Sequence, residues 1–244
     1  MTIRCVVPVS GGKDSQVCLE LALRHFPRES VIGLFNDTQF DHPMTYGHIL
    51  WMERYYGVRI ERTNAGSVPE KVLQYERFPN GVARFCTDDL KIKPSSKFYR
   101  DLATQQGRGF EVWLGMRSGE SSARAKRYAD ISDDALYAPH EILPNKYPKY
   151  LSKLGVMFAL PVLDWSTLDI LEFLDGRENP LYRAGFDRVG CFPCLAGGDK
   201  TKRRAFEFDD FGQQQFKIVE NLSQQIKKSV WTSKSEGVCS MCTI

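Results

Sequence analysis

The sequence lacks any segment that resembles a membrane span or an export signal. None of its 244 residues belongs to a run approaching the ~18 unbroken apolar residues that cross a bilayer. The N-terminus leads directly into a strand-like segment, without the charged, apolar and small-residue regions of a secretory signal. Internal repeats and low-complexity stretches are also missing. These absences predict a cytoplasmic protein that does not associate with membranes.

The sequence also has little net charge. The formal value of +3 at pH 7 is too small to indicate nucleic-acid binding by itself. Two local basic clusters, each taken alone, are typical of a solvated face, although a phosphate-rich partner stays open. The clusters consist of Arg124, Lys126 and Arg127, and of Lys200, Lys202, Arg203 and Arg204.

Short β-branched segments alternate with amphipathic segments along most of the chain. This alternation predicts an α/β fold, with a parallel, doubly wound sheet and helices on both of its faces. We expect residues 1–178 to form this domain and residues 179–244 to form a cysteine-containing C-terminal extension with a helix and a tail. The expected strands are 4–9, 31–35, 58–62, 110–114 and 157–162, and the expected helices are 15–26, 43–56, 95–104, 166–174 and 211–228.

A glycine-rich turn separates the first expected strand from the first helix. It consists of Ser10, Gly11, Gly12, Lys13, Asp14 and Ser15. Glycines let the main chain approach an anion closely, and the free N–H groups at a helix start attract phosphate. The lysine adds a full positive charge, and the serines add hydroxyl groups. The glycines are too close together for a Walker A motif, so we expect a phosphate-binding loop of another type.

A second polar loop follows the strand expected at 110–114 and contains Gly115, Arg117, Glu120 and Arg124. An arginine fork can hold phosphate oxygens through two hydrogen bonds. Glu120 can orient either arginine or help to bind Mg²⁺. Because ligands of open α/β sheets bind where the strands end, we expect this loop to contact the same phosphate.

These motifs resemble known families. The glycine-rich turn matches the signature of the PP-loop, or N-type, ATP pyrophosphatases. The superfamily of phosphoadenosine phosphosulfate (PAPS) reductases is similar in three further segments: Gly115 to Arg124, Pro161 to Ser166, and Asn179 to Cys194. Within it, the sequence is most similar to the ATP pyrophosphatase subunits of DNA phosphorothioation.

The resemblance implies that ATP is cleaved between its α and β phosphates, with Mg²⁺. It also implies catalytic roles for Lys13, Asp14, Arg117 and Arg124, and adenosine recognition near Asp37 and Thr38. An ordinary turn at the end of the second strand explains Asp37 and Thr38 equally well.

The seven cysteines do not predict a disulfide framework, because their number is odd and no export signal precedes them. Two of them, Cys5 and Cys18, lie in strand and helix patterns and are expected to be buried. Three others are candidate ligands of a metal or cluster: Cys86, Cys191 and Cys194. In related families a cysteine at the first of these positions joins a later Cys-x-x-Cys to bind an iron–sulfur cluster.

Three alternatives stay open for the role of the tail pair Cys239 and Cys242 in a metal or cluster site. Cys86, Cys191 and Cys194 alone can hold a cluster with one open iron. The tail pair can instead complete a zinc or iron site with Cys191 and Cys194. It can also remain free and act catalytically on persulfides or disulfides.

Three functional hypotheses follow. The first is an ATP pyrophosphatase that adenylates an oxygen of a nucleic acid for replacement by sulfur, with a cysteine desulfurase or another sulfur donor as partner. The second is a PAPS or adenylylsulfate reductase that forms sulfite. The third is a non-catalytic nucleotide-binding subunit. The intact Ser-Gly-Gly-Lys-Asp-Ser turn favours the first, since the reductases carry a degenerate version of it. A homodimer stays open.

Overall fold

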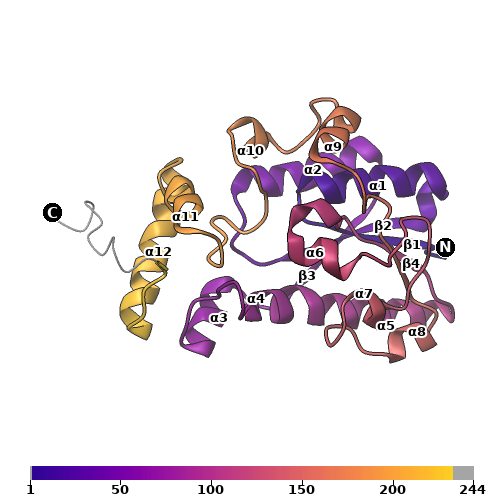
Figure 1. The fold of residues 1–244 in the computed structure, drawn as a ribbon, viewed down its shortest axis with the longest axis horizontal. Coiled ribbons are helices and arrows are strands. Elements are labelled where there is room, and N and C mark those ends of the chain that lie inside the picture. The colour runs from indigo at the N-terminus through magenta and orange to yellow at the C-terminus, as the bar shows by residue number, and fades with distance from the viewer. Residues whose placement is uncertain (1, 233–244) are drawn as a thin grey trace.

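The structure, a computed structural model, describes residues 2–232. Its centre is a sheet of five parallel strands in the order β3-β2-β1-β4-β5 (Figure 1). In this register Cys5 lies opposite Val31 on one side and Glu111 on the other. The strands are β1 (Cys5–Val9), β2 (Val31–Asp37), β3 (Ile60–Asn64), β4 (Glu111–Trp113) and β5 (Met157–Ala159).

Helices cover both faces of the sheet, which confirms the predicted parallel, doubly wound α/β fold (Figure 1). One face packs against α1 (Lys13–His25), α2 (Pro43–Tyr56) and α9 (Thr167–Leu174). The opposite face packs against α5 (Lys93–Gln106), α7 (Pro139–Ile142) and α8 (Tyr150–Lys153). Cys5 and Cys18 are fully buried, as expected.

The chain reverses its direction of travel across the sheet at β1. From β1 it proceeds to β2 and β3 on one side, and then crosses to β4 and β5 on the other. The connections that leave β1 and β4 therefore diverge and open a crevice at the carboxyl ends of these neighbouring strands. Both loops expected to bind phosphate start there.

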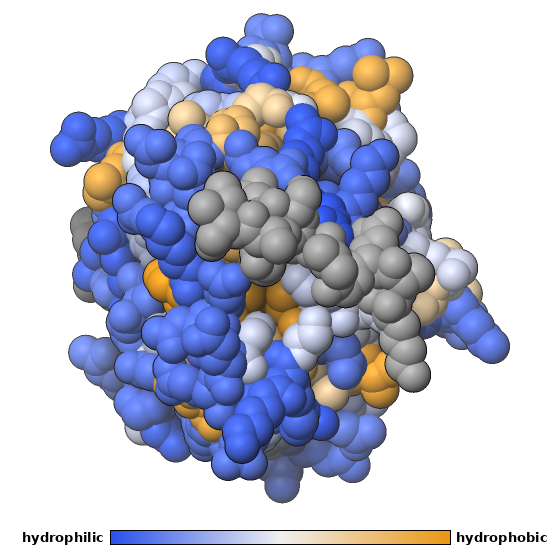
Figure 2. All heavy atoms as spheres, turned by 90° about the vertical axis from the view of Figure 1, so that its left-hand side faces the viewer, coloured by the Kyte–Doolittle hydropathy of each residue, from blue (hydrophilic) through white to orange (hydrophobic). Residues whose placement is uncertain are grey.

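A third layer forms at the C-terminal side of the molecule. Its helices α11 and α12 pack against α3 through a separate apolar cluster that includes Phe206, Val219 and Val72. Figure 2 shows that the face on this side is mostly hydrophilic, with apolar side chains in small patches. The remaining elements are η1 (Arg28–Ser30), α3 (Val68–Tyr75), α4 (Phe85–Thr87), η2 (Asp88–Ile92), η3 (Ser118–Glu120), α6 (Ser122–Arg127), α10 (Pro180–Arg183), α11 (Asp199–Phe206) and α12 (Asp210–Ile226).

Several local expectations were wrong. The sequence predicted an open loop up to Arg127, but α6 forms there because the Ser121 side chain accepts a hydrogen bond from the Arg124 N–H and caps the helix. Helix α3 was also missed, although Ser67 and Glu70 form a capping box at its start. The division at residue 178 stays a prediction. In the described part of the chain, no helix has the length and apolar character of a bilayer span.

Lys202 corrects the interpretation of its basic cluster as a solvated face. Its side chain is 0% exposed, and its ammonium group contacts Asp199 at 2.8 Å. The same group donates a 2.5 Å hydrogen bond to the Val230 carbonyl and lies 5.5 Å from the centre of the Trp231 ring. Lys202 thus fixes the segment that follows α12 onto α11.

Replacing this lysine should destabilise the fold. We expect Lys202→Met to lower the free energy of unfolding by about 3 kcal/mol, because it removes a fully buried ammonium group from its contacts with Asp199 and the Val230 carbonyl. Urea unfolding measures the change. Lys200→Met, at an exposed position of the same helix, should shift stability by less than about 0.5 kcal/mol. Equal stability of the two variants would contradict this role of Lys202.

Candidate functional site

The glycine-rich turn places the start of α1 directly after β1. Gly11 adopts φ +72°, and a Cβ atom there would lie 2.6 Å from the Thr45 Cγ2 atom, so the turn requires glycine. Gly12 is the N-cap of α1 and provides no side-chain cap. Among the described residues, none accepts a hydrogen bond from the main-chain N–H of Asp14 or Ser15. These free donors at a helix start form an anion-binding position.

Lys13, Asp14 and Arg117 form a chain of ion pairs at this position. The Lys13 ammonium lies 2.9 Å from one Asp14 carboxylate oxygen, and the Arg117 Nε atom lies 2.5 Å from the other. Arg117 is buried, and its remaining nitrogens donate to the Trp165 carbonyl and the Thr167 hydroxyl, both at 3.2 Å. Arg117 therefore links Asp14 to the start of α9, whereas Lys13 keeps donors for an anion.

The loop after β4 approaches the start of α1 closely. A Cβ atom on Gly115 would lie 2.7 Å from the Ser15 main-chain nitrogen, so only glycine permits this contact. Glu120 forms an ion pair with Arg124 and accepts a hydrogen bond from the Arg117 main-chain N–H. The loop thus lies against the glycine-rich turn, as the sequence predicted.

A cavity of about 670 Å³ opens between these two loops, and residues of both loops line it. Sequence reasoning gave no role to several of the side chains that line it. Tyr182 and Arg188 belong to the segment from Asn179 to Cys194, so their motif was visible but their position in the site was not. The lining residues are Ser10, Gly12, Lys13, Asp14, Ser15, Gly115, Met116, Arg117, Glu120, Arg124, Thr167, Leu171, Tyr182, Phe186, Asp187, Arg188 and Val189.

Asp37 and Thr38 do not line this cavity. The Asp37 carboxylate accepts hydrogen bonds from the Tyr46 hydroxyl and the Gln39 main-chain N–H. Thr38 is buried, donates to Asp41 at 2.7 Å, and lies 3.3 Å from the Cys191 sulfur. The predicted adenosine site at these two residues stays a prediction.

The three candidate cysteine ligands are half-buried and lie in one neighbourhood around Lys91. The pKa of Cys191 is raised to about 11, mainly by burial and also by Asp41, while Lys91 opposes both effects. Burial likewise raises the pKa of Cys86. The thiols of Cys86 and Cys191 are therefore protonated at neutral pH in this arrangement.

The described side chains do not form a metal site. Within residues 2–232, no group of three or more Cys, His, Asp or Glu side chains lies close enough together to hold a metal ion. Glu120, the acidic candidate for Mg²⁺, is already ion-paired with Arg124. We assign no reaction step to a cluster, zinc or Mg²⁺, and the predicted ligands Cys86, Cys191 and Cys194 stay a prediction. Cys239 and Cys242 lie outside the described residues.

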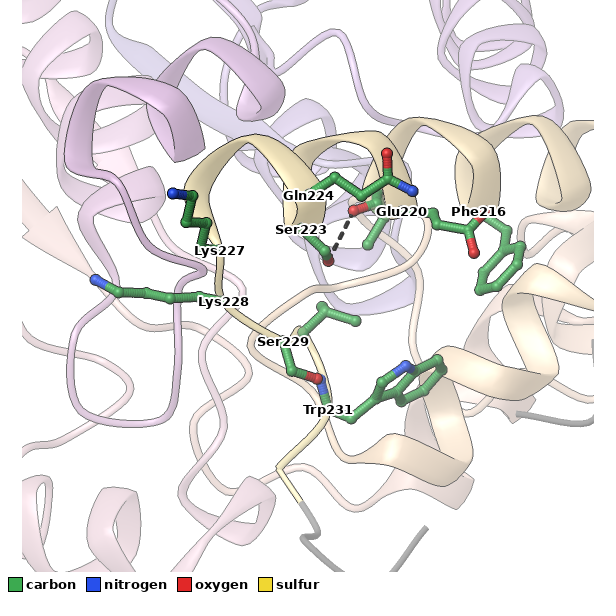
Figure 3. Close-up of a pocket in the computed structure, with 10 residues that line it drawn as sticks. Phe216, Glu220, Ser223, Gln224, Lys227, Lys228, Ser229 and Trp231 are labelled. Atoms are coloured by element: carbon green, nitrogen blue, oxygen red, sulfur yellow. Dashed lines mark hydrogen bonds between the residues drawn. The ribbon is translucent and has the colours of Figure 1, made fainter. Parts of the chain in front are cut away.

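A separate groove of about 380 Å³ follows the end of α12 (Figure 3). Ser223 lines it but donates its hydroxyl proton to the Val219 carbonyl, and Lys227 and Lys228 extend away from the groove in Figure 3. None of the predicted site residues lines this groove. The phosphate-binding features thus belong to the cavity between the glycine-rich turn and the Gly115 loop.

The fold and this cavity define a doubly wound parallel α/β protein with a cavity beside the start of α1. Residues 4–196 match the phosphoadenosine phosphosulfate reductase domain, and the chain belongs to that family. A PAPS reductase from Candida auris shares the fold, with a TM-score of 0.52 and 14% identity over 78% of this chain and 81% of that one.

Two relatives show how far the sequence similarity extends. An uncharacterised protein of Methanocaldococcus jannaschii is 30% identical over 94% of this chain and 45% of its own length. An adenosine 5'-phosphosulfate reductase of Rhodococcus opacus is 27% identical over 77% of this chain and 67% of its own length. The chain thus spans less than half of the archaeal relative.

Proposed function

We propose that this chain is an ATP pyrophosphatase that adenylates an oxygen of a nucleic acid for sulfur transfer, in the manner of DNA phosphorothioation. The observation that carries the proposal is the glycine-rich turn. Among the described residues, the main-chain N–H groups of Asp14 and Ser15 have no acceptor, and Lys13 lies beside them in a cavity of about 670 Å³. A triphosphate is the ligand that uses such an uncapped helix start together with a cation.

The proposed chemistry has two displacements. The acceptor oxygen attacks the α-phosphorus of ATP, the bond from that phosphorus to the α–β bridging oxygen breaks, and pyrophosphate leaves with the electron pair. A sulfide sulfur then attacks the activated acceptor, AMP leaves with the original oxygen, and the sulfide proton passes to solvent. Lys13 and the free N–H groups of α1 stabilise the charge that develops on the departing pyrophosphate.

Three arginines support a polyanionic acceptor. Burial lowers the pKa of Arg124, and the positive charges of Arg188 and Arg84 lower it further, so the three arginines lie near enough to interact. In the described part of the chain neither Arg84 nor Arg188 forms an ion pair, and the Asp187 carboxylate beside Arg188 is unpaired as well. Arg84 and Arg188, whose guanidinium groups form no ion pair in this part of the chain, can attract phosphodiesters.

In this proposal the acceptor phosphate would bind close to the cysteines where sulfur is transferred. Arg84 comes two positions before Cys86, and Arg188 comes three positions before Cys191. These short chain distances keep both cations near the cysteines, and Arg188 also lines the cavity. A cysteine desulfurase or another sulfur donor would supply the sulfide there.

A sulfonucleotide reductase is the second candidate function. Several relatives are named as such reductases, including the adenosine 5'-phosphosulfate reductase of Rhodococcus opacus. Product analysis separates the candidates. We expect AMP and pyrophosphate from ATP when an oligonucleotide and sulfide are present. Sulfite formed from PAPS with thioredoxin would favour the reductase instead. Nucleotide binding without either product would indicate a non-catalytic subunit.

Arg84 provides a test of the acceptor. We expect Arg84→Gln to weaken binding of a single-stranded oligonucleotide about 5- to 10-fold, and to reduce the slope of log affinity against log salt by about 1, because one phosphate contact is lost. Fluorescence anisotropy across a salt series measures both quantities. Arg100→Gln removes an exposed arginine that pairs with Asp101 on α5 and should change neither. Identical slopes for Arg84→Gln and the unaltered protein would rule out this acceptor site.

A further inference from the structure

Helix α10 is fixed onto the glycine-rich turn by Asn179. This side chain is fully buried, and its amide nitrogen donates a 3.1 Å hydrogen bond to the Gly11 carbonyl. Its amide oxygen accepts a 3.0 Å hydrogen bond from the Leu181 N–H and so caps α10. The start of α10 therefore has a fixed position relative to the phosphate-binding loop, although nearly the whole domain separates the two in sequence.

This attachment brings Tyr182 to the start of α1. The Tyr182 hydroxyl oxygen accepts a 3.1 Å hydrogen bond from the Lys13 main-chain N–H. The Lys13 ammonium lies 5.7 Å from the centre of the Tyr182 ring. A Cβ atom on Gly12 would lie 3.4 Å from the same hydroxyl oxygen. The Tyr182 hydroxyl thus lies beside the Lys13 N–H and ammonium groups, which are expected to bind a phosphate.

Among the described residues, the Tyr182 hydroxyl donates no hydrogen bond, although the residue lines the cavity. Its oxygen accepts from the Lys13 N–H and is also hydrogen-bonded to the Val189 main chain. Burial raises the pKa of Tyr182 to about 12, so the phenol keeps its proton at neutral pH. A protonated phenol without an acceptor, beside an uncapped helix start, suits an anionic oxygen.

We propose that the Tyr182 hydroxyl donates a hydrogen bond to a phosphate oxygen of bound ATP, and that Tyr182 is a phosphate-binding residue of this site. The inference rests on the proposed function, since it takes ATP as the ligand. It assigns a role to the segment from Asn179 to Cys194 beyond its cysteines. Lys13 and Tyr182, from opposite ends of the domain, then hold one phosphate between them.

The test compares two single-atom changes. Tyr182→Phe removes the hydroxyl and keeps the ring against Lys13. Tyr137→Phe is the matched control, because the Tyr137 hydroxyl also accepts a hydrogen bond from a main-chain N–H, that of Ser132 at 2.7 Å, outside the cavity. We expect Tyr182→Phe to weaken binding of inorganic pyrophosphate and of ATP about 10- to 100-fold in calorimetry, since a hydrogen bond to a charged group is lost. Adenosine binding and the control variant should not change.

The outcomes distinguish this inference from the proposed function. Unchanged pyrophosphate and ATP affinity in Tyr182→Phe, with an active unaltered protein, would refute the role of Tyr182 alone. Tighter binding would also refute it, because the hydroxyl would then compete with phosphate for the Lys13 N–H. An unaltered protein that binds pyrophosphate through Tyr182 but never releases it from ATP would contradict the proposed function and leave the inference standing.

Discussion

Lys13→Ala should reduce pyrophosphate release from ATP by about 10²- to 10³-fold, as expected when a main donor to a developing phosphate charge is removed. The variant should fold normally, because Asp14 keeps its ion pair with Arg117 when the lysine is gone. An enzyme-coupled pyrophosphate assay measures the rate, and circular dichroism checks the fold.

Lys97→Ala is the control for this change. Lys97 is an exposed residue of α5 that pairs with Asp101, far from the cavity lining. Its replacement should leave the rate of pyrophosphate release unaltered. If Lys13→Ala releases pyrophosphate as quickly as this control, the glycine-rich turn does not hold the triphosphate.

Gly115→Ala has the second largest expected effect, although it adds only a methyl group. The new Cβ atom would lie 2.7 Å from the Ser15 nitrogen and 2.8 Å from the Asp14 carbonyl carbon, and both are main-chain atoms that cannot rotate away. The loop after β4 must therefore move away from the start of α1. A displacement of this size at a phosphate-binding site costs about 10²-fold in rate and about 1–3 kcal/mol in stability.

The same loop provides a matched control. A Cβ atom on Gly119 would meet nothing within 4 Å, so Gly119→Ala should behave like the unaltered protein in thermal unfolding and in pyrophosphate release. Normal activity of Gly115→Ala would mean that the close approach of the two loops is not needed for catalysis.

Sequence reasoning succeeded where the signal is local. The strand, the glycine-rich turn and the helix that starts at Lys13 follow one another without interruption, and hydrophobic periodicity indicates both flanking elements. The same holds for the loop after β4, where Gly115 follows a buried strand. Because parallel strands end at one edge of the sheet, these two loops could be placed together before their contact was known.

The remaining parts of the site depend on contacts between distant residues. Tyr182 lies more than 160 positions from Lys13, and only the fixation of α10 by Asn179 brings them together. Lys202 appeared solvated because charge patterns carry no information on Val230, which returns from beyond α12 to meet it. Thr38 directly follows β2 at the expected edge, yet its hydroxyl lies beside the Cys191 sulfur, because Cys191 forms an isolated antiparallel bridge with Asp41.

The central claim is that the start of α1 holds the triphosphate of ATP. A crystal structure with an ATP analogue that resists cleavage between the α and β phosphates tests it most directly. The account predicts phosphate oxygens within hydrogen-bond distance of the Asp14 and Ser15 main-chain nitrogens, the Lys13 ammonium and the Tyr182 hydroxyl. An analogue bound elsewhere, with these donors still facing water, would contradict it.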